Sequence, residues 1–213
     1  MTYSSRSKSA FTLVELLMVM MVITILYCIS LSVIRTVSRS AYKTAARAEL
    51  KSIETALKQY YAHYLTWPKL PEGQDPSGGE SPSESEDPAI NAELAAILTG
   101  TNTDRSDLSR NPEKIIFIEF ARQDADGTPY NPWGVSGRYD TEKCLYHLDV
   151  DSDGDNYVLP SPPRGISKVA AGLPSDGNLC GSVAVWTLNP EVAVPSNGDD
   201  IDAVREYLLG NWQ

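Results

Sequence analysis

The chain opens on a short polar stretch, and a long apolar run follows it. Between Phe11 and Ile34 the single charged residue is Glu15. At about 1.5 Å per residue, these 24 residues form a helix of roughly 36 Å, which is enough to cross a bilayer. A carboxylate inside such a helix costs about 2.5–3.5 kcal/mol or more, so Glu15 marks a function. The pattern predicts a membrane helix over 11–34.

The helical pattern continues beyond the apolar run. No Pro or Gly occurs over 35–66, and apolar residues recur at spacings of three and four, namely Leu50, Ile53, Leu57, Tyr61 and Tyr64. We therefore expect one helix from about Phe11 to about Thr66, ending before Pro68. Its second half, 35–66, should cover the rest of the chain, with Tyr60, Tyr61 and Tyr64 in packing roles.

The remaining residues, 67–213, predict a small head. Residues 72–88 are rich in Ser, Pro, Gly and acidic side chains, as is typical of a flexible loop. Helical spacing over 89–98 ends at Gly100. Strands are expected over 115–120, 144–150 and 182–188. These elements predict an α+β head, with an antiparallel sheet laid on the long helix.

Charge is distributed unevenly along the chain. The net charge is −10, but residues 35–58 hold six basic and two acidic residues, a net of +4. From residue 59 onward there are ten basic and 25 acidic residues, a net of −15. Such a head is unsuited to nucleic acid and suits a cation or a soluble surface. The basic residues after the apolar run favour placing that side in the cytoplasm.

The acidic residues include one run with the spacing of a cation loop, made by Asp149, Asp151, Asp153 and Asp155 around Gly154. Pro160 stands where a calcium loop of this kind needs a bidentate Glu, so a plain acidic turn is the favoured interpretation. Catalysis is not predicted. His63 and His147 lack metal-site spacing, and no nucleophile or phosphate-loop motif is present.

The N-terminus resembles the leader of type IV pilins and of type II secretion pseudopilins. The matching residues run from Ala10 through Phe11 to Glu15, and the family usually has Gly in the place of Ala10. The resemblance implies cleavage by a prepilin peptidase between Ala10 and Phe11, removal of the leader 1–10, and methylation of the new amine. It also implies that Glu15 pairs with the amine of a neighbouring subunit, and that the head lies outside the cytoplasm, against the charge count.

Two further segments are similar to major pseudopilins. Asn131-Pro-Trp-Gly134 resembles a D-P-W-G turn, in which Trp133 would hold the turn against the core and Gly134 would supply permissive torsions. The ending, Asn197 to Ile201 and then Asn211-Trp212, resembles the close of the same proteins. The resemblance implies a Ca2+ site at Asn197, Asp199 and Asp200, in preference to the run 149–155.

The resemblance thus implies a type IV pilin-like fold and a structural role without enzyme activity. The expected protein is a pseudopilus subunit of a type II secretion system, single-pass in the inner membrane with its head in the periplasm. Its partners would be further copies, other pseudopilins, the prepilin peptidase and the assembly platform in the membrane. The alternatives are a type IV pilus subunit and a membrane-anchored binding domain that never polymerises.

An exported head would lie in an oxidising compartment. Its cysteines, Cys144 and Cys180, are then expected to form one disulfide, and two separate buried thiols are the alternative.

Overall fold

A computed structural model describes residues 11–69, 90–103, 108–134, 139, 144–151, 153–160, 163, 166–176 and 179–213, and it describes 31–36 by backbone alone. The chain divides into two compact units, Met1–Ala41 and Tyr42–Gln213. The boundary falls inside the long helix, so its last turns belong to the second unit. The leader 1–10 and the acidic loop 72–88 lie outside the described residues.

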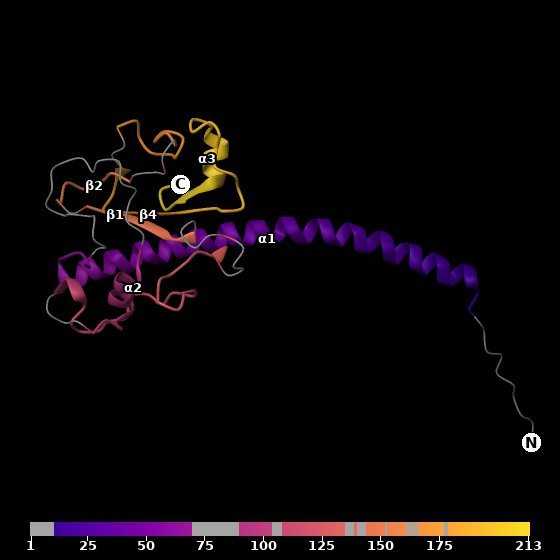
Figure 1. Ribbon diagram of the computed structural model, residues 1–213, viewed down its shortest axis with the longest axis horizontal. Coiled ribbons are helices and arrows are strands. Elements are labelled where there is room, and N and C mark those ends of the chain that lie inside the picture. Colours follow the sequence, from indigo (N-terminus) through magenta and orange to yellow (C-terminus); the bar gives the residue numbers. More distant parts are fainter. Residues whose placement is uncertain are drawn as a thin grey trace, which may run out of the picture. The chain divides into compact units, whose positions relative to one another are not determined.

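Helix α1, Leu13–Tyr64, is the predicted long helix, and it is continuous over 52 residues (Figure 1). Its end follows from the sequence beyond it. Leu65 adopts a left-handed backbone with φ of 56°, which closes the last turn, and Pro68 cannot continue a helix. The prediction of one helix through both the apolar and the amphipathic stretches is confirmed.

The second unit is α+β and contains a small antiparallel sheet. Strands β1 (Tyr146–Val150), β4 (Val183–Leu188) and β5 (Leu208–Gly210) lie in the order β1-β4-β5. Strand β4 is central and buried along most of its length, whereas β1 alternates between buried and half-buried residues. A separate two-stranded sheet joins β2 (Tyr157–Val158) to β3 (Leu179–Cys180).

Three short helices complete the described fold. Helix α2 (Ala92–Thr99) begins at Asn91, whose side chain accepts the N–H of Leu94 at 2.9 Å. It ends at Gly100 with φ of 70°, as predicted. A 3-10 turn, η1, covers Leu108–Arg110, and helix α3 covers Ile201–Tyr207.

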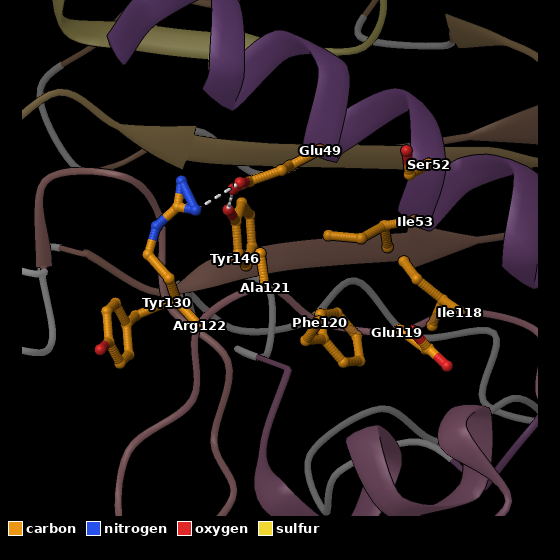
Figure 2. Close-up of a pocket in the computed structure, with 10 residues that line it drawn as sticks. All are labelled: Glu49, Ser52, Ile53, Ile118, Glu119, Phe120, Ala121, Arg122, Tyr130 and Tyr146. Atoms are coloured by element: carbon orange, nitrogen blue, oxygen red, sulfur yellow. Dashed lines mark hydrogen bonds and ion pairs between the residues drawn. The ribbon is translucent and has the colours of Figure 1, made fainter.

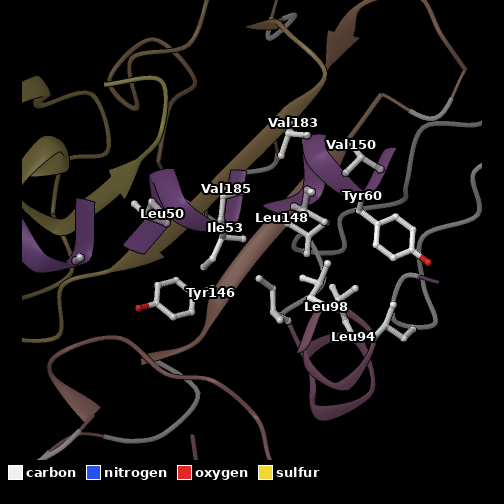
Figure 3. Packing of buried hydrophobic residues seen from close by; sticks show 14 of the residues in the cluster. Leu50, Ile53, Tyr60, Leu94, Leu98, Tyr146, Leu148, Val150, Val183 and Val185 are labelled. Atoms are coloured by element: carbon white, nitrogen blue, oxygen red, sulfur yellow. The ribbon is translucent and has the colours of Figure 1, made fainter. Parts of the chain in front are cut away.

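The main core lies where α1, α2, β1 and β4 meet (Figure 3). Leu50, Ile53 and Leu57 are buried there, as the helical spacing predicts. The tyrosines correct the prediction in one respect. Tyr60 is fully buried, whereas Tyr61 is 42% exposed and stacks on Trp67 with ring centroids 4.5 Å apart.

The predicted strand over 115–120 is wrong. The segment is extended but joins no sheet among the described residues. The side chain of Asn111 holds its start by bonding both the N–H and the carbonyl of Ile115. The N–H of Phe117 donates to the carbonyl of Leu98 at 2.9 Å. Bonds to a loop and to a helix end thus replace the strand partner.

Asn131 and Asn211, from the two motifs in the head, bind the two ends of β4. The amide of Asn131 donates to Thr187 and to the carbonyl of Leu188, and Trp133 beside it is 2% exposed. Asn131 also accepts the N–H of Trp133, so the predicted turn is confirmed. Glycine is needed at position 134 because a Cβ there would lie 2.5 Å from the ring of Tyr130. Its φ is not positive, so the reason for glycine is space and not the permissive torsions that were predicted.

The tail reaches β4 from the other end. The side chain of Asn211 accepts the N–H of Val185 and donates to the carbonyl of Val183. Trp212 covers Gly210 and donates to the carbonyl of Ala171, closing a second small core. The residues 202–210 that separate Ile201 from Asn211 complete α3 and form β5.

Candidate functional site

The surface of the N-terminal half of α1 is predominantly apolar. Among the described residues, Leu13–Ser30 is the stretch long and apolar enough to cross a membrane, judged by length and composition. None of its side chains is buried. Phe11, the first described residue, is 80% exposed. This coarse property, one membrane-length helix near the N-terminus, agrees with a single-pass anchor.

The polar side chains of this stretch bond within their own helix. The hydroxyl of Thr24 donates to the carbonyl of Met20 at 2.7 Å, and that of Ser30 donates to the carbonyl of Leu26 at 2.9 Å. In lipid every polar group needs such an internal partner, because no water replaces it. Thr24 and Ser30 are therefore compatible with a hydrocarbon environment.

Glu15 lies in the first turn of α1 and closes a capping box with Thr12. Its carboxylate accepts both the backbone N–H of Thr12, at 2.9 Å, and the Thr12 hydroxyl, at 3.0 Å. The Thr12 hydroxyl accepts the N–H of Glu15 in return, at 3.3 Å. The carboxylate therefore points back toward the start of the helix, next to Phe11. Ala10, the other residue of the predicted cleavage site, lies outside the described residues.

The acidic run after β1 gathers three carboxylates. Asp151, Asp153 and Asp155 have oxygen atoms within 4.8 Å of one another, and the last two are exposed. The same oxygens accept backbone N–H groups of the loop, including those of Gly154 and Asn156 onto Asp151. An acidic turn accounts for these bonds without an ion.

Asp149 stands apart from that cluster. Its carboxylate accepts the N–H of Leu159 at 2.7 Å, which ties β1 to the end of the loop. Burial raises the pKa of this carboxyl above its ordinary value, and the bond from Leu159 only partly offsets the effect. A charge held there lowers the stability of the fold unless a cation compensates it.

The preferred calcium residues have local roles in the structure. Asn197 accepts the N–H of Asp199 in a turn. Asp200 is the N-cap of α3 and accepts the N–H groups of Asp202 and Ala203, both at 3.2 Å. A capping carboxylate keeps further lone pairs, so Asp200 can still contribute an oxygen to a cation.

Cys144 and Cys180 are not joined by a disulfide in the structure. Cys144 is fully buried in the main core, where its carbonyl accepts the N–H of Asn131. Cys180 is exposed on β3, opposite Tyr157.

A polar network beneath the sheet was not predicted from the sequence. The carboxylate of Glu49 on α1 accepts a hydrogen bond from the guanidinium of Arg122 at 2.8 Å and another from the hydroxyl of Tyr146 on β1 (Figure 2). Burial raises the pKa of Tyr146, so its hydroxyl remains a donor. Arg122 and Tyr146 lie 73 and 97 positions after Glu49, and no local sequence pattern signals that the three residues meet.

No protein-family model, curated protein or solved structure matches the chain.

Proposed function

We propose that the chain is a structural subunit of a pseudopilus of a type II secretion system, processed by a prepilin peptidase and polymerised from the inner membrane. One observation carries the proposal: a lone carboxylate, Glu15, lies in the first turn of the exposed apolar stretch Leu13–Ser30, shortly after the Ala10–Phe11 junction. The α+β head on the same helix is compatible with this role.

The energetics of Glu15 favour assembly. A carboxylate in lipid is costly when it is unpaired, and a neighbouring amine lowers that cost. In the single chain Thr12 donates two hydrogen bonds to the carboxylate but supplies no positive charge. An amine on Phe11 of an adjacent subunit would supply that charge, and would thereby make each new subunit contact favourable.

Processing gives the first test. In cells with an active prepilin peptidase, mass analysis of the membrane-extracted protein should find a chain that starts at methylated Phe11. Recovery of the intact Met1 terminus from such cells would contradict the proposal.

Assembly gives the second test. Glu15→Ala should insert at least as well as the wild type but lose the ladders produced by cross-linking of overexpressed filaments. The matched control is Thr24→Val, because that hydroxyl bonds only within its own helix; this variant should keep its ladders. Normal ladders from Glu15→Ala would make the carboxylate incidental. If the wild type gives no ladders either, the chain is a non-polymerising anchor.

Calcium binding by the tail loop belongs to the same proposal. An ion that binds only the folded head raises its melting temperature. Asp199→Ala should abolish that rise, whereas Asp151→Ala should leave it intact. The reverse result would move the ion to the loop after β1, and an unchanged wild type on calcium addition would remove the site altogether.

A further inference from the structure

The segment that fails to become a strand, residues 115–121, is the feature that the proposed function leaves unexplained. We call it the open segment. Its sequence, Ile-Ile-Phe-Ile-Glu-Phe-Ala, has the β-branched and aromatic composition of a strand. Ile116 is 62% exposed, and the remaining apolar side chains up to Phe120 are half-buried. An apolar extended segment at a surface is a template for another chain.

One side of its backbone is occupied. Hydrogen-bonding groups of successive residues in an extended chain point to opposite sides. The N–H and carbonyl of Ile115 bond the side chain of Asn111, and the N–H of Phe117 donates to the carbonyl of Leu98. The backbone groups of these odd-numbered residues therefore point toward the protein.

The other side of the backbone is open. The N–H and carbonyl groups of Ile116, Ile118 and Phe120 bond nothing in the part of the chain that the structure describes. Three consecutive even-numbered residues thus form a free strand edge. An incoming extended chain would find donors and acceptors at the strand spacing.

A pocket lies along the open segment (Figure 2). It measures about 80 Å³ and lies between the open segment and Ser52 and Ile53 of α1, with the network of Glu49, Arg122 and Tyr146 at its wall. A cavity of about 150 Å³ holds a benzene ring, so this one suits a smaller apolar group such as the side chain of valine. Partner strands gain affinity from main-chain bonds and specificity from pockets of this kind.

The charge around the edge selects a basic partner. Glu119 is exposed, and its carboxylate has no partner among the described residues. The nearby cation, Arg122, is already bonded to Glu49. The carboxylate of Glu119 therefore favours lysine or arginine directly opposite it, where cross-strand side chains approach to about 5 Å.

A second copy of the chain fits the edge poorly. The open segment runs antiparallel to α1, since Phe117 contacts Tyr60 whereas Arg122 bonds Glu49. Antiparallel pairing of two such segments about a two-fold axis would point the two α1 helices in opposite directions. Subunits that share one membrane hold these helices parallel, which excludes that pairing. Parallel pairing in register would place Glu119 opposite Glu119, and like charges directly opposite each other are destabilising, so we take the occupant to be a different polypeptide.

We propose that the open segment binds an extended apolar peptide segment of a partner protein by strand addition. The partner adds a strand along Ile116, Ile118 and Phe120. A small apolar side chain enters the pocket beside Ser52, and a lysine or arginine lies opposite Glu119. This function adds to polymerisation and does not depend on it.

The test uses the full-length chain in detergent micelles and two end-capped, fluorescently labelled peptides. One is Val-Thr-Val-Lys-Val-Thr-Val, and its twin has Glu in place of Lys. Fluorescence anisotropy should show binding of the Lys peptide roughly three- to tenfold tighter than that of the Glu peptide. Glu119→Lys should invert this preference, because it exchanges the sign of the charge at the edge.

A proline substitution tests the backbone hydrogen bonds of the edge separately from the charge of Glu119. Ile118→Pro removes an N–H that faces outward and should abolish binding of the Lys peptide. Thermal unfolding of Ile118→Pro in the same micelles is the control: a midpoint close to that of the wild type shows that lost binding reports the edge and not lost folding. Equal binding of both peptides by the wild type and by Glu119→Lys, or no binding of either, would overturn the proposal. So would a full-length dimer dissociated by Ile118→Pro, which would assign the edge to a second copy.

Discussion

Replacing Asn211 with alanine tests whether the tail holds the sheet together. The change leaves the backbone bond from residue 211 to the carbonyl of Val185 in place, at 3.0 Å. It removes the side-chain bonds from the N–H of Val185 at 3.0 Å and to the carbonyl of Val183 at 3.2 Å, together with the contribution of Asn211 to the environment of the Glu54 carboxylate. Both valines lie on the central strand, and Val185 is fully buried. The removal therefore leaves a buried donor and a buried acceptor unpaired.

An unsatisfied buried group costs about 1–3 kcal/mol, and a carbonyl is at the low end of that range, so Asn211→Ala should lower the free energy of unfolding by about 2–4 kcal/mol. For a unit of this size the melting temperature should fall by roughly 5–15 °C. Unfolding of the full chain in micelles, followed by tryptophan fluorescence, measures the change, since Trp186 is buried and Trp212 is half-buried.

The control is Asn197→Ala, because that side chain bonds only the N–H of Asp199 at the surface. In chelator, where no calcium occupies the tail loop, it should change the unfolding free energy by less than about 0.5 kcal/mol. If Asn211→Ala behaves like this control, the side-chain bonds of residue 211 to β4 do not stabilise the sheet.

Three further outcomes follow from the contacts of the head. In chelator, Asp149→Asn should raise the melting temperature at pH 7: the folded pKa lies above the ordinary value of 3.8, so charging this carboxyl costs stability as pH rises, and the gain should vanish below pH 3.8. Burial works against ionisation of Glu54, but bonds from Lys58 and Lys51 outweigh it and hold its pKa below 4.5. Its stabilising effect is present above pH 4.5 and is lost on further acidification, so Glu54→Gln should flatten acid unfolding curves in that range; unchanged curves would contradict the ion pairing. Iodoacetamide should modify Cys180 in the native protein and Cys144 only after unfolding, and a linked peptide pair in non-reducing maps would restore the predicted disulfide.

Local patterns were sufficient for the elements whose causes are local. The apolar run and the spacing of Leu50, Ile53 and Leu57 specify α1, because a helix bonds within itself and needs only one apolar face. The same holds for α2, whose cap residues Asn91 and Gly100 lie next to its ends. The strands β1 and β4 were expected within two residues of their observed starts, since β1 alternates apolar and polar residues and β4 is a short apolar run.

Tertiary structure decided everything that needs a partner far along the chain. The segment 115–121 has the composition of a strand, yet it joins no sheet among the described residues, because Asn111 and Leu98 bond its inner side. The choice of Tyr60 over Tyr61 for the core, a single 100° step around α1, depended on where the sheet lies. The oxidising compartment expected for an exported head suggested a bond between Cys144 and Cys180, whereas packing placed one thiol in the core and the other at the surface. Periodicity reports which face of an element is apolar, and only the assembled fold determines what that face meets.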